Sequence, residues 1–367
     1  MHTDGAPSYQ PSGSQVSVVS ETFSRWFAFD AGMADAPAFM PMLLPADHDW
    51  QRRVIERAKE LDHEHRRRTR GLWQSTVGLA LSLRFLRTAA RQLVTAPRRP
   101  EPRRVEHPGP DQIAVTFVGH ATVMLTTPLA RVLTDPYLGD FCLGLRRAEA
   151  ACLHPADAAD VNLILISHAH RDRLDLASLR RLRGRAAVLV PPRCAPLVDG
   201  LGFARVVELA PGQSFEYADV EVTAVAARHE GARGLFDRAW RGACGYIVRS
   251  AGANVYFAGG TAYFSGFEEI GRRLHPDVAL LPMAGYEPPG LRESNMSPLD
   301  AVQAFTDLGA KLLVPVGYGS FPLSYEPLAE PLAWLRQICA ERGLLDQLAV
   351  LGHGETCLVR GGESTRA

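Results

Sequence analysis

Two histidines and an aspartate lie within five residues in the middle of the chain. His168, His170 and Asp172 directly follow the apolar run 163–167, LILIS. Two histidines at this spacing, leaving a strand on a turn, can point at one centre, and neutral imidazole is a good zinc ligand. A catalytic zinc needs three protein ligands and an open position for water, and Asp172 is close enough to hold a second ion or to orient that water. The segment therefore predicts a metal site.

His229 is the best candidate for a third ligand. It follows the apolar run 220–227 and precedes Gly231 and Gly234, so we expect it at the exit of a strand. A buried structural histidine is the alternative for an isolated residue of this kind. Together with the pair at 168 and 170, His229 would complete a three-histidine zinc site.

These histidines need strands that end close together. We expect short strands over 113–118, 122–126, 162–167, 187–190, 220–226, 246–248, 254–257, 278–281, 311–316 and 348–351. We expect helices over 175–182, 298–308 and 327–342, with Asp175 and Ser297 as N-caps. Strands come first as hairpins and later alternate with helices, which favours a layered α/β or α+β domain.

Composition narrows the class of protein. The 367 residues carry 40 Lys and Arg against 40 Asp and Glu, so the net charge is zero, which argues against a nucleic-acid binder. The six cysteines are scattered without a C-x-x-C pair, which fits a reduced cytosolic compartment and leaves histidine to bind any metal. The sequence has no G-x-S-x-G, P-loop or H-E-x-x-H motif, so serine hydrolases, nucleotide hydrolases and thermolysin-like proteases lack support.

The first 105 residues differ in character from the rest. Residues 46–105 carry 15 Lys and Arg against 7 acidic residues, whereas 106–367 have a net charge of −5. We expect disorder over 1–15, a polar helix over 46–70 and a Pro- and Arg-rich linker over 96–110. The basic surplus is either a solvated helix face with its linker or a contact to a membrane surface or a partner.

An apolar segment, 75–94, lies between this helix and the linker. It contains Arg84, Arg87 and Arg91, whose charges exclude a plain transmembrane helix. At spacings of three and four the arginines share one helical face. We expect an amphipathic helix that either packs on the main domain or lies on a membrane surface.

Six ordered motifs follow residue 110. They are FVGHAT at 117–122, LTDP at 133–136, HAHRDR at 168–173, YFAGGTAY at 256–263, LPMAGY at 281–286 and DAVQAFTDLGA at 300–310. Together they resemble the metallo-β-lactamase fold, in the branch similar to N-acyl-phosphatidylethanolamine phospholipase D and lactonase-type hydrolases. The resemblance implies an α+β fold over 106–367, a four-layer αββα sandwich with a metal site at one edge of its two sheets. It leaves 1–105 as an N-terminal helical extension.

The resemblance also implies a ligand set. His168, His170 and His229 correspond to the three histidines of the family's first metal site. A zinc ion on them is chemically sufficient, because three histidines alone can acidify a bound water towards neutral pH.

The second metal site of the family is depleted in this chain. Of its four residues only Asp172 remains, Arg173 replaces the last histidine of the H-x-H-x-D-H signature, and Gly260 replaces the bridging aspartate. The late histidine is missing from the segment 317–319, GYG, and Asn295 stands where the branch usually has another histidine. One carboxylate cannot build a second divalent site. We therefore expect one zinc ion rather than two, with no ion as the alternative.

Further residues are candidates for the surroundings of the metal. Arg173 either holds an anionic group or a developing oxyanion, or simply pairs with Asp172 or Asp175. Asp135 either orients a ligand histidine or is a plain turn aspartate. His120 either lines the site or packs at a strand end, and His353 is a weaker candidate for either role. Tyr286 and Tyr318 are expected in the pocket.

The sequence thus predicts a single-zinc hydrolase acting on an ester, amide, lactone or phosphodiester bond. Asp172 would position or deprotonate the water, and Arg173 would hold an anionic group. The alternative is a catalytically inactive relative that serves as a binding or scaffold protein. We expect a small-molecule or lipid-like substrate, no nucleic acid, and a cytoplasmic location with either no membrane association or a peripheral contact through 75–94. The polar start of the chain shows no secretory signal.

Overall fold

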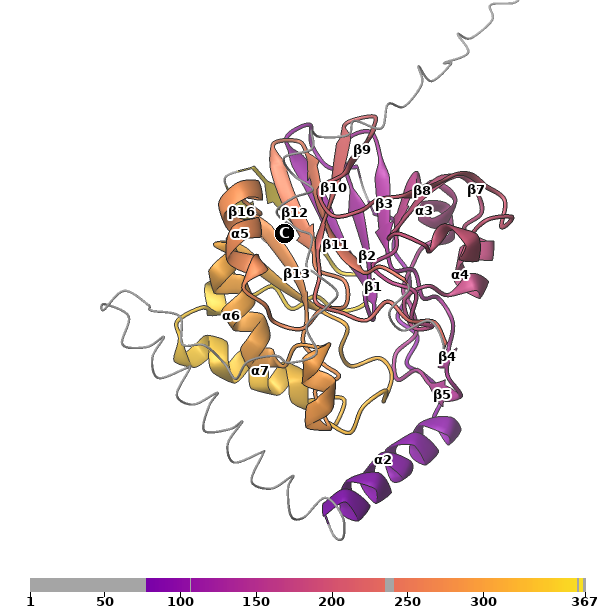
Figure 1. The fold of residues 1–367 in the computed structure, drawn as a ribbon, viewed down its shortest axis with the longest axis vertical. Coiled ribbons are helices and arrows are strands. Elements are labelled where there is room, and N and C mark those ends of the chain that lie inside the picture. Colours follow the sequence, from indigo (N-terminus) through magenta and orange to yellow (C-terminus); the bar gives the residue numbers. More distant parts are fainter. Residues whose placement is uncertain (1–76, 106, 235–240, 362, 366–367) are drawn as a thin grey trace, which may run out of the picture.

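The computed structural model describes residues 77–105, 107–234, 241–361 and 363–365, shown in Figure 1. The expected disordered start over 1–15 and the expected helix over 46–70 lie outside these residues.

The first sheet has eight strands in the order β16-β15-β1-β2-β3-β6-β7-β8. Its strands are β1 (Gln112–Gly119), β2 (Thr122–Thr126), β3 (Arg131–Thr134), β6 (Leu163–Leu165), β7 (Gly184–Val190), β8 (Phe203–Glu208), β15 (Thr356–Arg360) and β16 (Glu363–Thr365). The pairs from β16 to β3 are antiparallel, and those from β3 to β8 are parallel. A separate hairpin, β4 (Phe141–Cys142) and β5 (Leu145–Arg146), follows β3 in the chain.

The second sheet has six strands in the order β14-β13-β12-β11-β10-β9. They are β9 (Ser214–Tyr217), β10 (Val220–Ala226), β11 (Cys244–Ser250), β12 (Ala253–Phe257), β13 (Val278–Pro282) and β14 (Leu312–Val316). The inward side chains of both sheets, such as Leu163, Val222 and Leu280, form one buried core between them. The alternation of inward and outward residues along each strand produces this layer.

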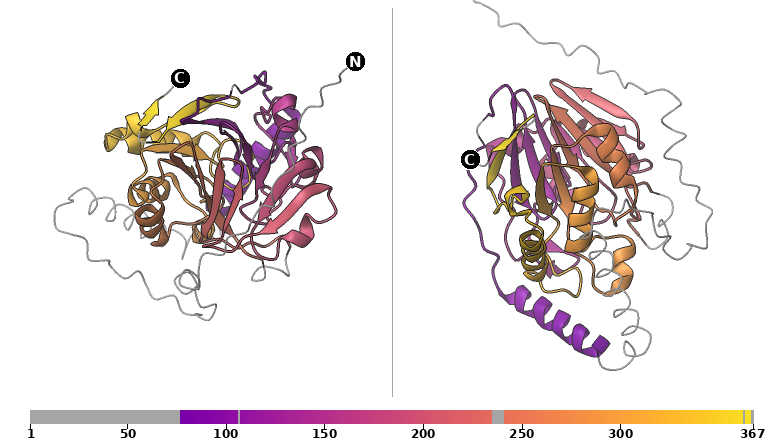
Figure 2. Two further views of the ribbon diagram at one scale, coloured as in Figure 1. Left: turned by 90° about the horizontal axis from the view of Figure 1, so that it is seen from above. Right: turned by 90° about the vertical axis from the view of Figure 1, so that its left-hand side faces the viewer.

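Helices cover the outer face of each sheet, as Figure 2 shows. On the second sheet lie α5 (Gly266–Leu274), α6 (Pro298–Leu308) and α7 (Glu330–Glu341), and on the first lie α3 (Pro155–Ala159) and α4 (Leu176–Arg181). The predicted αββα sandwich is therefore confirmed. The predicted caps are confirmed too: Ser297 forms a capping box with Asp300, and the Asp175 side chain accepts from the first turn of α4.

Some element predictions fail. Residues 348–351 are not a strand, because Leu348 makes only an isolated bridge with Leu313 before the chain turns back at Gly354. Helix α5 was not expected. Its sequence, GFEEIGRRL, is short and polar, and it buries only Phe267, Ile270 and Gly271 against its surroundings.

The amphipathic segment forms helix α2 (Val77–Val94), which lies beside the β4–β5 hairpin (Figure 1). It packs on the main domain, which is one of the two positions expected for this segment. The ring of Phe85 is 5.4 Å from that of Tyr325, Ala89 is buried, and Arg146 Nη1 donates to the Leu93 carbonyl at 3.3 Å. Within the described residues, the helices are all too short or too polar to cross a membrane.

The buried core between the sheets leads to a prediction about stability. Leu280 is fully buried there, so Leu280→Ala should lower the free energy of unfolding by about 3 kcal/mol, through lost burial and the cavity left behind. The matched control is Leu129→Ala at an exposed leucine, which should change stability by less than about 0.5 kcal/mol. Urea unfolding monitored by circular dichroism measures both, and equal effects would contradict the assignment of Leu280 to the core.

Candidate metal centre

Three histidine rings converge at one edge of the sandwich. His168 and His170 follow β6 of the first sheet, and His229 follows β10 of the second. One nitrogen from each ring lies within 4.8 Å of the others, and the ring centroids are 4.1 to 5.0 Å apart. The structure therefore brings together the three residues that the sequence proposed as metal ligands. The sheets are joined close by, where Cys244 N donates to the Ser167 carbonyl at 3.0 Å and the Tyr246 hydroxyl donates to the Ile166 carbonyl at 2.9 Å.

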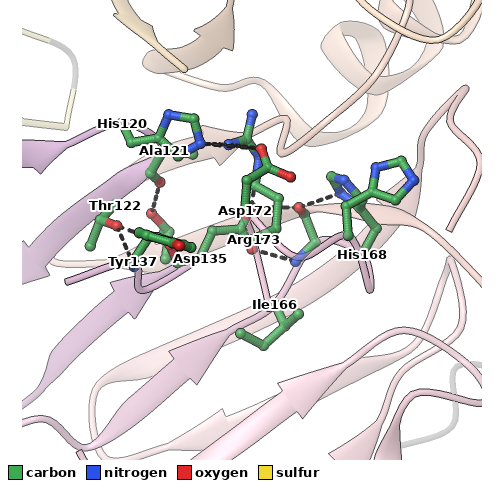
Figure 3. Close-up of polar contacts among 12 residues, drawn as sticks. His120, Ala121, Thr122, Asp135, Tyr137, Ile166, His168, Asp172 and Arg173 are labelled. Atoms are coloured by element: carbon green, nitrogen blue, oxygen red, sulfur yellow. Dashed lines mark hydrogen bonds and ion pairs between the residues drawn. The ribbon is translucent and has the colours of Figure 1, made fainter. Parts of the chain in front are cut away.

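His168 is oriented through Ser167 by the buried carboxylate of Asp135 (Figure 3). Ser167 Oγ donates to Asp135 Oδ2 at 2.6 Å, and the Ser167 amide donates to Oδ1 at 2.7 Å. Ser167 Oγ lies 2.9 Å from His168 Nδ1. When the Asp135 carboxylate is ionised it takes the Ser167 hydroxyl proton, so that Ser167 Oγ accepts from His168 Nδ1–H. The Nε2 lone pair of His168 is then available for a metal.

His229 is oriented by a different group. Its Nδ1–H donates to the Ser294 carbonyl at 2.6 Å, so Nε2 carries the lone pair and lies 3.2 Å from His170 Nδ1. Burial and the neighbouring His170 lower the pKa of His229 to about 4, and burial lowers the pKa of His168 well below its usual value. The rings of His168 and His229 are therefore neutral near pH 7. Three convergent imidazole nitrogens, two of them on rings held by Ser167 and by the Ser294 carbonyl, are a donor set that fits zinc.

Two glycines after β12 allow the chain to pass close to these rings. A Cβ on Gly260 would lie 2.5 Å from His168 Cε1 and 3.2 Å from His229 Nε2. Gly259, at φ +66°, would bring a Cβ to 2.2 Å from that of Ser167. Such approaches exclude a side chain unless the histidines shift. Gly260 thus supplies no carboxylate where the family has its bridging aspartate. Because it has no side chain, its backbone can pack against His168 and His229.

Asp172, Arg173 and His120 form a second, adjoining cluster (Figure 3). Arg173 Nη1 is 2.9 Å from Asp172 Oδ2, and Arg173 Nε is 3.6 Å from Asp135 Oδ2. His120 Nε2 lies 3.2 Å from Asp172 Oδ2 and also contacts Arg173 Nη1. Arg173 therefore pairs with Asp172, while Asp175 instead caps α4, accepting from Ser178 N at 2.9 Å.

Charge and burial oppose each other in this cluster. Burial would raise the pKa of Asp172, but the Arg173 guanidinium and the hydrogen bond with His120 hold it well below its usual range. Burial raises the pKa of Asp135 to about 7, against the lowering effect of Arg173 and Ser167. Burial and the same guanidinium lower the pKa of His120 to about 4, so this ring is neutral. Arg173 is thus a fixed cation between two carboxylates.

The backbone is strained at two positions of the site. His120 has φ 61° and Asp135 has φ 31°, both in the left-handed region that non-glycine residues rarely occupy. Each such residue costs roughly 1–3 kcal/mol and persists only where the surroundings over-determine it. The Asp135 carbonyl accepts from Thr122 Oγ1 at 2.9 Å, and Gly317 N donates to the His120 carbonyl at 2.7 Å. These bonds hold the backbone at both positions, from which Asp135 reaches Ser167 and His120 reaches Asp172.

The two predicted pocket tyrosines make their described contacts elsewhere. Tyr286 donates from its hydroxyl to Glu330 Oε1 at 2.8 Å, and Tyr318 stacks on Phe117 with ring centroids 6.2 Å apart. His353 packs edge-on against Phe117, and its Nδ1 bonds the Ala150 carbonyl. It also lines a hollow of about 660 Å³ that includes none of the three convergent histidines. None of the contacts described for these residues reaches those three histidines.

Sequence reasoning missed Ser167 and the Ser294 carbonyl. A hydroxyl directly between an apolar strand and the first histidine was a signal for Ser167. A backbone carbonyl from a distant loop leaves no mark in the sequence.

A family model described as a beta-lactamase superfamily domain matches residues 130–318, more than half of the chain. An uncharacterized protein of Mycobacterium tuberculosis is 34% identical over 234 residues, covering 60% of this chain. The chain spans 62% of the length of that relative.

Two further relatives carry functional names. A metal-dependent hydrolase of Pyrococcus furiosus is 28% identical over 246 residues, covering 66% of this chain and 98% of the relative. The N-acyl-phosphatidylethanolamine-hydrolyzing phospholipase D 1 of Caenorhabditis elegans is 27% identical over 248 residues, covering 62% of this chain and 70% of the relative.

Among solved structures, an isothiocyanate hydrolase from Delia radicum gut bacteria shares the fold. Its TM-score is 0.56 at 20% identity, covering 68% of this chain and 99% of that one. The αββα layers, the ordered motifs and the matched domain agree, and the chain belongs to the β-lactamase superfamily, with the metallo-β-lactamase fold.

Proposed function

We propose that this protein is a metal-dependent hydrolase that uses one zinc ion held by His168, His170 and His229. The observation that carries the proposal is the convergence of three imidazole nitrogens within 4.8 Å at the edge of the sandwich. Membership of the superfamily and the names of the Pyrococcus and Caenorhabditis relatives support it. Zinc in a three-histidine site supplies a Lewis acid that lowers the pKa of a water ligand towards neutrality.

The remaining steps fall to residues of the second cluster. The ionised carboxylate of Asp172, beside the histidines, accepts a hydrogen bond from the attacking water and fixes its direction. Arg173 keeps that carboxylate ionised. Its Nη2 faces Gly317, where a Cβ would lie 3.4 Å away, so no side chain of that residue covers it. Nη2 is therefore the donor proposed for an anionic group of the substrate or for a developing oxyanion.

The charges of the site support the proposal of a single ion. Asp135 and Asp172 are already balanced in part by Arg173, at 3.6 Å and 2.9 Å. Gly260 provides no ligand, and its backbone packs against His168. A second divalent ion would therefore have to displace the Arg173 guanidinium. Of the family's second-site ligands it would find only the carboxylate of Asp172.

The substrate class is an ester, amide, lactone or phosphodiester, on a small molecule or a lipid-like one. The Caenorhabditis relative, which acts on a phospholipid by its name, supports the lipid-like end of this range. The alternative function, a binding or scaffold protein without catalysis, is favoured by the same depleted second site. Metal content and hydrolysis measured together separate the two.

The central prediction concerns metal content and activity. Protein reconstituted with excess zinc and then desalted should retain one zinc ion per chain by plasma mass spectrometry. It should hydrolyse at least one of a nitrophenyl ester, an acyl lactone and bis-nitrophenyl phosphate. His229→Ala should abolish both properties, whereas His107→Ala at an exposed histidine should change neither.

Each other result has a defined meaning. No retained zinc in the wild type would contradict the proposal. Two ions per chain would contradict its single-ion part. One retained zinc without hydrolysis of any of these substrates would favour the binding or scaffold alternative.

Ser167 gives a prediction about orientation rather than ligation. Ser167→Ala removes the link between Asp135 and His168, and zinc affinity should fall by about 10- to 100-fold. Competition with a chromophoric chelator measures this. Ser214→Ala is the matched control, because Ser214 is also buried and hydrogen-bonded, to Thr223, but lies in β9. Equal affinities in the wild type and Ser167→Ala would show that His168 is held by packing alone.

Gly260 gives a steric prediction. Gly260→Ala adds a Cβ 2.5 Å from His168 Cε1, so the histidine must move and zinc affinity should fall by about tenfold or more. Gly290→Ala is the control, since a Cβ there meets nothing within 4 Å. Zinc affinity of Gly260→Ala at the wild-type level would contradict the close approach.

A further inference from the structure

Helix α2 leaves apolar side chains in water after it has packed on the domain. Leu83, Leu86, Leu93 and Val94 are 44–84% exposed. At about 100° per residue they fall within one arc of the helix, together with the exposed Ala90. The side turned to the domain holds Phe85 and Ala89. The exposed apolar arc is therefore additional to the face that the protein body covers, which is unusual for a helix of a water-facing domain.

The arginines of α2 border this arc. Arg87 and Arg91 are exposed, and by the same helical geometry they lie next to Leu83 and Val94. Helix α2 contains three arginines and no acidic residue. Neither Arg87 nor Arg91 has an ion pair with any other residue that the structure describes. The helix thus combines an exposed apolar arc with a basic rim.

The β4–β5 hairpin extends the same surface. Phe141 and Leu143 are 53% and 70% exposed. Arg146 joins the two segments, since its Nη1 donates to the Leu93 carbonyl and its guanidinium carbon lies 5.6 Å from the centre of the Phe141 ring. Figure 1 shows the end of α2 next to this hairpin.

We propose that this α2–hairpin surface (Leu83, Leu86, Leu93, Val94, Phe141 and Leu143 with their arginine rim) docks the protein on an anionic lipid bilayer. Leucine, valine and phenylalanine gain free energy by entering the boundary between headgroups and acyl chains. The rim arginines complement anionic headgroups, each contributing attraction that added salt screens. Charge complementarity of this kind, with no acidic residue in the helix, selects a lipid surface over a neutral apolar partner.

The surface also adjoins the candidate metal centre. The Tyr137 hydroxyl donates to the Phe141 carbonyl at 2.5 Å, and the Tyr137 ring packs on Phe321, whose ring lies 5.4 Å from that of His120. A docked bilayer would therefore lie on the side of the molecule that carries the site. The inference concerns binding alone, and it stands whether or not the histidines catalyse hydrolysis.

The test is flotation of the full chain with vesicles of phosphatidylcholine alone or mixed with phosphatidylglycerol. Wild type should bind the mixed vesicles, and added salt should weaken the binding. The pairs Leu86→Gln with Leu93→Gln and Phe141→Ser with Leu143→Ser should each weaken it by about tenfold or more. Arg87→Gln with Arg91→Gln should weaken it by about tenfold.

The control pair is Leu129→Gln with Leu345→Gln, two exposed leucines outside this surface, which should bind as wild type. Circular dichroism checks that each variant is folded. Absence of wild-type binding, equal binding to both vesicle types, or an equal loss in the control pair would overturn the proposal. So would light scattering that shows a dimer abolished by the Leu86 and Leu93 changes, because a second copy would then occupy the surface.

Discussion

The Asp135 carboxylate is the constraint on which the candidate metal centre depends. It lies fully buried after β3, where it accepts from the amide and the hydroxyl of Ser167 and faces the guanidinium of Arg173. Through Ser167 it orients His168. Through Arg173, which contacts Asp172 and His120, it also influences the positions of those two side chains. A buried carboxylate must be hydrogen-bonded or paired, so the positions of all these groups are coupled. The left-handed backbone of Asp135 itself is one cost of that arrangement.

Much of the fold could be predicted because its signals are local. The apolar runs of β2, β10 and β13, and the Ser297 cap before α6, depend on neighbouring residues and were found within about two residues of their limits. Helix α5 was missed because it has few apolar residues, and 348–351 was misread because an apolar run can pack in the core without pairing as a strand. The order of the motifs, rather than periodicity, led to the four-layer architecture.

The three histidines could also be predicted from the sequence, since two of them follow one strand and the third follows another. Their orientation could not, because it depends on the Ser294 carbonyl and on an aspartate 32 residues before Ser167. The sequence left two explanations open for Arg173, an anion site or an ion pair. The ion pair with Asp172 is present, and Nη2, which faces Gly317, is the nitrogen that we propose for the other role. The structure adds a second reason for Gly260. It lacks the family's carboxylate ligand, and its backbone lies so close to His168 that a side chain would not fit.

The placement of the histidines at strand ends has a consequence for how the protein matures. The two sheets and their helices bury a continuous apolar core, and none of the three histidines is needed to complete it. Small zinc domains fold only when their ion binds, because the ion replaces a core that they lack. Here the core is complete without the histidines, so an ion bound by them would not be required for folding and could be exchanged without unfolding. The identity of a bound ion would then depend on the supply of metals in the compartment and on the Irving–Williams order. It would not depend on which ion was present while the chain folded.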